Sequence, residues 1–138
     1  MPDVFASEGI VIMATSTAQK VKAIDATYYT VKDIGAQTKF YTDLLGAEPN
    51  VAMPNFFSEW SLAGGGSFGL YKSESGQVNG GGVMFAVDDV KAAVAEHKAR
   101  GVAFADTIED IPTCHMAFGT DPEGLSFILH RRKDGTAG

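Results

Sequence analysis

The chain repeats one pattern of strand and helix signals, and this repeat constrains its fold more than any other feature. Residues 24–34 lead into an amphipathic segment, and residues 82–90 lead into a second one. The paired landmarks of the two copies are Val31 and Val87, Asp33 and Asp89, and Gly46 and Gly101. The first two pairs lie 56 residues apart (87 − 31 and 89 − 33). Two strand–helix units at such a period predict a duplicated module with a ligand site between its copies.

Each copy is predicted to have the order βαβββ, which places the chain in the α+β class. Asp33 and Asp89 stand where a side chain can cap the first turn of a helix. Gly46 suits the left-handed residue that follows the last turn. We expect strands, in chain order, at residues 23–31, 49–53, 56–62, 67–71, 83–87, 102–105, 114–119 and 125–130.

Length and charge limit the classes of function. The 138 residues suffice for one domain with a hydrophobic core. The net charge of −6 argues against a nucleic-acid partner, which needs a basic face, and gives no support to binding anionic membranes. The expected organisation is a flexible extension at residues 1–20, a single domain at 21–133 (module one 23–76, module two 78–132) and a tail at 134–138.

Cysteine use and the first residues suggest a compartment. Cys114 is the only cysteine, so the chain cannot form an internal disulfide, and a reducing compartment explains this most simply. The first 20 residues do not match a signal peptide, because Asp3 and Glu8 precede a short apolar run. No apolar run reaches the roughly 20 residues of a membrane span. We therefore expect a cytoplasmic protein with no nucleic-acid or membrane partner.

Three segments together resemble the vicinal oxygen chelate superfamily, which includes glyoxalase I, bleomycin-resistance proteins and extradiol dioxygenases. The segments are residues 40–46 (FYTDLLG), 87–90 (VDDV) and 121–124 (DPEG). The resemblance covers roughly residues 23–133. It implies that the two βαβββ modules form a cup of curved mixed sheets flanked by helices, and it favours a homodimer.

The resemblance also implies four positions for metal ligands, two on the first strands of the modules and two on the last. Aligned by the Val-x-Asp segments and the terminal hairpins, these positions hold Ala26, Gly82, Gly69 and Ile128. None of the four carries the imidazole, carboxylate or thiolate that a catalytic Zn, Fe, Mn or Ni site needs. We therefore expect no metal and no cofactor, and a cup that binds a small molecule, as the resemblance implies for bleomycin-resistance-type members.

Strand alternation predicts which side chains line this cup. Glu59 and His130 are the candidates for acid and base catalysis, because a carboxylate in a cup and an imidazole can exchange protons near neutral pH. The pattern leaves open whether Glu59, His115 and His130 face the cup or solvent. The expected ligand-binding residues are Tyr28, Glu59, Tyr71, Met84, His115, Ile128 and His130.

The leading hypothesis is a metal-independent protein that binds a small molecule of unknown identity. The rival hypothesis is an enzyme. It is either a lyase or isomerase with Glu59 and His130 as acid and base, or a metal enzyme with relocated ligands at Glu59, His115 and His130. A third hypothesis is a scaffold whose cup is filled by its own side chains.

Overall fold

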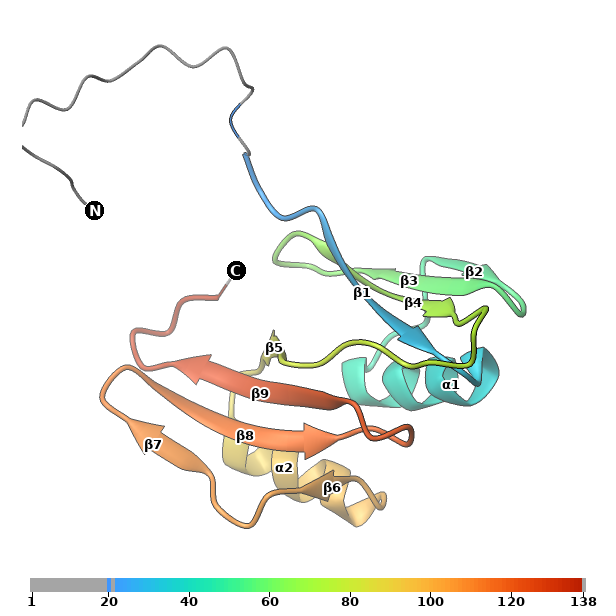
Figure 1. Ribbon diagram of the computed structural model, residues 1–138. Helices are drawn as coiled ribbons and strands as arrows, with labels where there is room; N and C mark the ends of the chain where they lie inside the picture. The colour runs from blue at the N-terminus through green and yellow to red at the C-terminus, as the bar shows by residue number, and fades with distance from the viewer. Residues whose placement is uncertain (1–19, 21, 138) are drawn as a thin grey trace, which may run out of the picture.

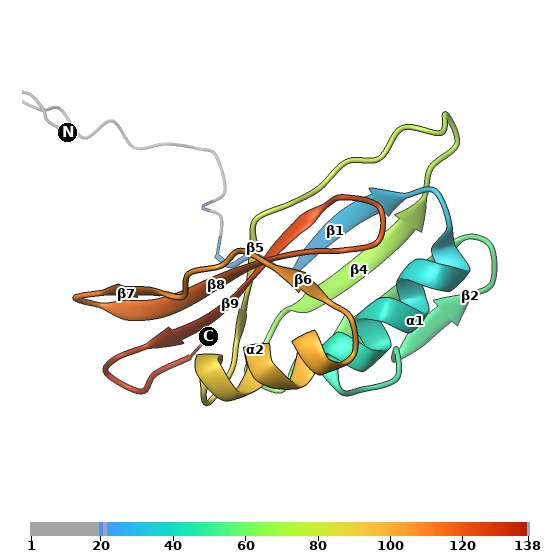
Figure 2. The same ribbon diagram turned by 90° about the horizontal axis from the view of Figure 1, so that it is seen from below.

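The computed structural model describes residue 20 and residues 22–137, and its strands form two separate sheets (Figures 1 and 2). Module one contains, in chain order, β1 (Ala26–Val31), α1 (Ile34–Leu45), β2 (Val51–Met53), β3 (Phe57–Ser61) and β4 (Ser67–Lys72). Module two contains β5 (Val83–Ala86), α2 (Val90–Ala99), β6 (Ala103–Phe104), β7 (Glu109–Ile111), β8 (Cys114–Thr120) and β9 (Ser126–Arg132). The predicted α+β fold of two modules is confirmed. Apart from Lys20, the predicted extension at residues 1–20 lies outside the described residues.

The two modules build their sheets in the same way. Sheet 1 has the strand order β1-β4-β3-β2, and sheet 2 has the order β5-β9-β8-β6, with β7 also paired to β8. In each sheet the first strand of the module runs parallel to the last, and the other pairs are antiparallel. Figure 1 shows α1 below sheet 1 and α2 below sheet 2. We call the sheet surface toward the helices the helix face and the opposite surface the open face.

The helices begin and end at the residues that the sequence indicates. The carboxylate of Asp33 accepts a hydrogen bond from the backbone N–H of Ala36, and Asp89 does the same for Ala92, both at 3.0 Å. Gly46 follows α1 with a φ of 71°, the left-handed conformation that glycine adopts without strain. Neither α1 nor α2, the helices of the described part of the chain, is long and apolar enough to cross a bilayer.

One hydrophobic core joins the two modules on their helix faces. The ring of Tyr41, from α1, lies 4.9 Å from Phe68 of sheet 1, and 6.5 Å from both Phe85 and Phe127 of sheet 2, centroid to centroid. Phe68 and Phe85 are themselves 5.1 Å apart, in an edge-to-face arrangement that aromatic pairs favour. The hydroxyl of Tyr29 donates to the backbone carbonyl of Ser126 at 2.7 Å. The modules therefore share buried surface rather than packing separately.

A buried carboxylate connects the first helix to the turn before β9. Asp121 accepts hydrogen bonds from Gln37 Nε2 at 2.8 Å and from the Tyr41 hydroxyl at 2.7 Å. It also accepts from the backbone N–H groups of Glu123 and Leu125, at 2.9 and 3.0 Å. Burial and the hydrogen bond to Asp121 raise the pKa of Tyr41, so its hydroxyl stays protonated and donates. Four donors thus compensate the cost of burying this charge.

Module two contains one strand that the sequence did not indicate. β7 pairs with the first half of β8, whereas β6 pairs with its last two residues. The sequence Glu109-Asp110-Ile111 offers no alternation, and all three residues are exposed. A short edge strand whose side chains are all exposed leaves little trace in the side-chain pattern. The predicted strand at 102–105 also shortens to the two residues of β6.

Candidate functional site

The open face of sheet 1 has a row of three residues at its centre. Tyr28 of β1 lies beside Gly69 of β4, which lies beside Glu59 of β3. Trp60, the neighbour of Glu59, is buried on the helix face, and this places Glu59 on the open face. The Tyr28 side chain crosses Gly69, and its hydroxyl donates a hydrogen bond to Glu59 Oε1. The face of Glu59, which the pattern alone left undecided, is thereby assigned.

Tyr28 occupies the space that a side chain at position 69 would need. A Cβ added to Gly69 would overlap ring atoms Cδ1 and Cε1 of Tyr28. The hydrogen bond to Glu59, burial and the nearby carboxylate raise the pKa of Tyr28 to about 12. Tyr28 is therefore protonated near neutral pH and donates to the Glu59 carboxylate.

Further aromatic rings extend this surface toward the end of β4. The Tyr71 ring lies 4.8 Å from that of Tyr28 and 5.4 Å from that of Phe57, which stands opposite it on β3. Phe56 adds a ring at 5.9 Å from Tyr71. We call Tyr28, Phe56, Phe57 and Tyr71 the aromatic cluster. Phe56 and Phe57 were not among the predicted ligand-binding residues, although the place of Phe57 opposite Tyr71 in the predicted hairpin could have indicated it.

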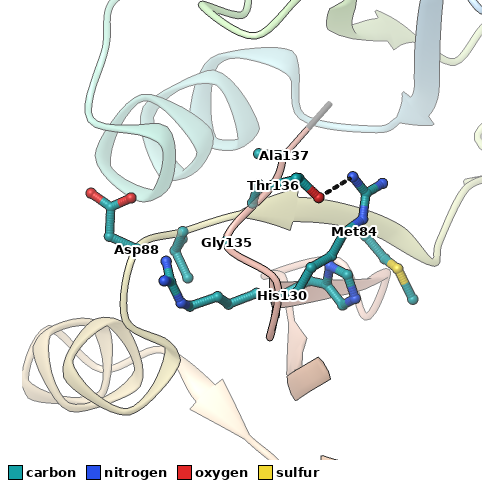
Figure 3. A pocket seen from close by; sticks show the side chains of 10 residues that line it. Met84, Asp88, His130, Gly135, Thr136 and Ala137 are labelled. Atoms are coloured by element: carbon teal, nitrogen blue, oxygen red, sulfur yellow. Dashed lines mark hydrogen bonds between the residues drawn. The ribbon is translucent and has the colours of Figure 1, made fainter. Parts of the chain in front are cut away.

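The open face of sheet 2 carries three more of the predicted residues. Met84 of β5 pairs in register with Ile128 of β9, and His130 follows two residues later on the same face. A cavity of about 290 Å³ lies beside Met84 and His130 and is bounded by the tail residues Gly135, Thr136 and Ala137 (Figure 3). The tail is held near β9 by a 3.3 Å hydrogen bond from Arg132 to Thr136 Oγ1.

A second cavity of about 490 Å³ adjoins the first along β5. Both are lined by Met84, Ala86, Val87 and Ala137. The second extends to the turn between β3 and β4, where Leu62 contributes an apolar wall. Together they form a largely apolar space with His130 at one end, which is the usual composition of a small-molecule site.

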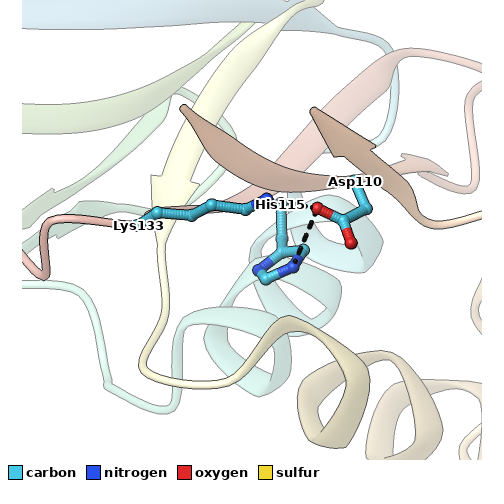
Figure 4. A network of polar contacts seen from close by, with 3 residues as sticks. All are labelled: Asp110, His115 and Lys133. Carbon is cyan, nitrogen blue, oxygen red and sulfur yellow. Dashed lines mark hydrogen bonds and ion pairs between the residues drawn. The ribbon is translucent and has the colours of Figure 1, made fainter. Parts of the chain in front are cut away.

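His115 lies apart from the other predicted site residues. On β8 it stands one residue before Met116, and Met116 pairs with His130, so the two histidines point to opposite faces of sheet 2. Nε2 of His115 lies 3.4 Å from Oδ1 of Asp110, and the same oxygen accepts a hydrogen bond from Lys133 (Figure 4). The hydrogen bond from Lys133 lowers the pKa of Asp110. His115 thus belongs to an exposed polar cluster on the helix face.

The predicted site residues therefore fall into three groups. Tyr28, Glu59 and Tyr71 share the open face of sheet 1, whereas Met84, Ile128 and His130 share that of sheet 2. His115 faces the other way. The three residues of each sheet lie close together on its open face. Among the described residues, no hydrogen bond or ion pair links the group on sheet 1 to the group on sheet 2.

The residues present do not fit the metal site that the resemblance implies. Gly69 lies beneath the Tyr28 ring, so this position cannot hold a ligating side chain while Tyr28 stays in place. Within residues 20 and 22–137, no three His, Cys, Asp or Glu side chains are grouped so that they could hold a metal ion. The relocated set of Glu59, His115 and His130 is accordingly not assembled in this part of the chain.

Comparison with known proteins agrees with the fold. An NMR structure of protein ATC0852 from Agrobacterium tumefaciens is 28% identical, with a TM-score of 0.68 over 86% of this chain and 100% of that one. TnmS3, an antibiotic binding protein from Streptomyces sp. CB03234, is 20% identical with a TM-score of 0.71, over 84% of this chain and 100% of that one. A lactoylglutathione lyase from Agrobacterium tumefaciens is 19% identical with a TM-score of 0.67, over 81% and 95%.

The last two structures show the fold alone, because their identity to this chain is low. No curated protein matches the chain. A family model described as Glyoxalase/Bleomycin resistance protein/Dioxygenase superfamily matches residues 23–129, which include both sheets almost completely. The chain therefore belongs to the Glyoxalase/Bleomycin resistance protein/Dioxygenase superfamily.

Proposed function

We propose that this protein binds a small organic molecule on its open faces without the help of a metal ion. The observation that carries the proposal is the position of Tyr28 above Gly69. Where the resemblance implies a metal ligand, this chain has an aromatic ring hydrogen-bonded to a carboxylate. The ring and its neighbours form a surface on which a flat apolar molecule can stack.

Exposure of large apolar side chains supports a role in binding. Tyr28, Tyr71, Met84 and Phe118 lie on the open faces and are 37–51% exposed. Clusters of large exposed apolar side chains commonly mark binding sites on soluble proteins. TnmS3, whose fold is similar, is an antibiotic binding protein, and this agrees with a binding role here.

Two measurements on the purified protein test the proposal. A library of small aromatic compounds is screened by amide NMR, and the proposal expects hits that shift the signals of Tyr28, Tyr71, Met84 or His130. Metal content is measured after incubation with Zn, Ni, Mn and Fe salts followed by desalting. One tightly held ion per chain, or hits confined to other surfaces, would overturn the proposal.

The rival proposal is a lyase or isomerase that uses Glu59 and His130 as acid and base. Glu59 is half-buried and receives the Tyr28 hydroxyl, which suits a carboxylate that acts on a bound molecule. Once a ligand is known, Glu59→Gln and His130→Ala separate the two proposals. Conversion of the ligand that is lost in these variants, with binding retained, would favour the enzyme.

We also infer a homodimer in the cytoplasm. The dimer is supported by the two apolar open faces, which a second copy could cover in part. The cytoplasm is supported by Cys114, the single and buried thiol of the chain. Light scattering during size-exclusion chromatography tests the dimer, and fractionation of the source cells tests the compartment.

A further inference from the structure

We propose that the open face of sheet 1 selects an organic cation, a protonated amine or quaternary ammonium group attached to a flat apolar body. This rests on the proposed function and names the ligand class that the same surface favours. Three observations support the proposal: the geometry of the aromatic cluster, the position of the Glu59 carboxylate beside it, and the hydrogen bond from Tyr28 that orients this carboxylate.

The aromatic cluster offers ring faces at distances that suit a cation. Tyr28 and Tyr71 are tilted by 45° to one another with centroids 4.8 Å apart, and Phe57 is tilted by 37° to Tyr71 at 5.4 Å. Ring faces tilted in this way can converge on one small group above them. A cation is attracted to ring faces within ~6 Å of their centroids, because the aromatic quadrupole is negative there.

Glu59 is the only charged residue that the strands of sheet 1 place on this open face. Strand alternation and the pairing register assign to it Ala26, Tyr28, Thr30, Val51, Met53, Phe57, Glu59, Ser61, Ser67, Gly69 and Tyr71. Lys72 pairs with Val31, whose side chain is fully buried on the helix face, so Lys72 belongs to the other surface. Among the strand residues of this open face the one formal charge is therefore negative, and the net charge of −6 has the same sign.

Glu59 is held ready for a positively charged partner. Its Oε1 receives the Tyr28 hydroxyl, and among the described residues no donor hydrogen-bonds to Oε2. Tyr28 orients the carboxylate without neutralising it, because the phenol stays protonated. A ligand ammonium above the rings can reach the remaining oxygen and form a charge-assisted hydrogen bond or ion pair. An anionic ligand would instead be repelled by the Glu59 carboxylate and would lose part of its hydration shell on binding.

Three probes with one naphthalene body test the inference: naphthylmethyl-trimethylammonium, naphthylmethanol and naphthoate. Their affinities for the full chain are measured by isothermal titration calorimetry at low and at physiological salt. We expect the cation to bind about tenfold more tightly than the alcohol, the scale of one favourable charge contact. The anion should bind most weakly, and the preference for the cation should shrink as salt rises.

Variants locate the origin of the preference. Glu59→Gln should reduce the ratio of the affinity for the cation to the affinity for the alcohol from about tenfold to about one. Asp43→Asn is the matched control, because it removes one exposed carboxylate from α1, on the helix-face side of sheet 1. Tyr71→Leu keeps Glu59 and removes one ring, so it should weaken the cation more than the alcohol. Thermal unfolding of each variant checks that it is folded.

The outcomes separate this inference from the proposed function. If the alcohol binds wild type as tightly as the cation does, the inference is wrong, while small-molecule binding stands. If Asp43→Asn reduces the preference as much as Glu59→Gln, net charge rather than this site attracts the cation, and the inference is again wrong. If no probe binds to the open face at millimolar concentration, both the inference and the proposed function fail.

Discussion

Asp121 shows at the scale of one residue how the two modules are held together. Its carboxylate is buried, and it receives two side-chain donors from α1 and two backbone donors from its own turn. A buried charge is tolerated only when hydrogen bonds replace the water it has lost. The two bonds from α1 attach the helix of module one to the turn before β9, and the two backbone bonds hold that turn in shape.

Replacing Asp121 with asparagine should destabilise the protein strongly. The amide keeps the shape, but its NH2 group would face donors from Gln37 or Tyr41, and the charge that strengthens all four bonds would be lost. We expect the free energy of unfolding to fall by roughly 2–4 kcal/mol. Urea denaturation at neutral pH measures this. Asp106→Asn, in an exposed loop, is the control and should change it by less than about 0.5 kcal/mol.

Tyr28 should titrate abnormally because of its hydrogen bond to Glu59. Its pKa of about 12 lies above its ordinary value of 10.0, so the protonated form is favoured in the folded state. The resulting stability is complete below pH 10 and is lost as the pH rises toward 12. Ring NMR of labelled tyrosine should show this high pKa in wild type and a value closer to 10.0 in Glu59→Gln. An unchanged pKa in the variant would contradict the assigned hydrogen bond.

At the scale of the elements, both sheets place an aromatic ring over a glycine of the neighbouring strand. Tyr28 of β1 covers Gly69 of β4, and Phe127 of β9 covers Gly119 of β8, each across a directly paired position. The glycine leaves space for the ring to lie flat on the sheet. The two rings differ in how freely they can move, because Tyr28 is 38% exposed on the open face and Phe127 is fully buried in the core.

Alanine at the two glycines should therefore have unequal effects on stability. At Gly119 the new methyl group meets a ring that cannot move, and we expect a loss of about 2–3 kcal/mol. At Gly69 the exposed Tyr28 can swing away, and the remaining close contact is the backbone oxygen of Ser58 at 3.1 Å from the added Cβ. The loss should therefore be smaller, about 1 kcal/mol, accompanied by a fall in the pKa of Tyr28. Chemical denaturation measures both. Gly64→Ala, where nothing lies within 4 Å of the added Cβ, is the control. Equal losses at both glycines would contradict this account.

The sequence allowed features set by local residue type to be predicted, such as helix ends, but not features set by the pairing and packing of strands. The caps at Asp33 and Asp89 and the left-handed Gly46 follow from residue type, so both helices could be predicted. The orientation of Glu59 could not, because apolar residues occur on both faces of β3 and only packing against α1 selects one. β7 was missed because it is held by backbone bonds to β8.

The predicted site suffered from the same limit. Alternation assigns His115 to one face of its strand, but whether that face also holds His130 depends on the register of β8 with β9. Strand register is set by tertiary structure and could not be derived from the sequence. His115 was therefore predicted to bind ligand together with His130, although the two side chains point to opposite faces of sheet 2. The contact of Tyr28 with Glu59 could not be predicted for a similar reason, since it needs three strands in register across Gly69.

At the scale of the whole molecule, the duplicated modules form one core and not two. Tyr41 of module one contacts the rings of Phe85 and Phe127 in module two. The carboxylate of Glu123 accepts hydrogen bonds from the backbone N–H groups of Lys32 and Asp33, each at 2.7 Å. Separating the modules would expose these rings and leave the amides before α1 without their partner. Each module alone would have fewer than the ~60 residues at which domains become marginal.

The full chain should therefore unfold in a single transition, and neither half should fold alone. A fragment of residues 20–76 keeps all of sheet 1 and α1 but loses Phe85, Phe127 and Asp121, which cover and satisfy Tyr41. We expect its NMR spectrum to lack the dispersion of a folded protein. For the intact chain, the calorimetric and van't Hoff enthalpies of unfolding should agree, as in two-state unfolding. A dispersed spectrum from the fragment, or two separate transitions in the chain, would mean that the repeat encodes two domains and that the shared core contributes little to holding them together.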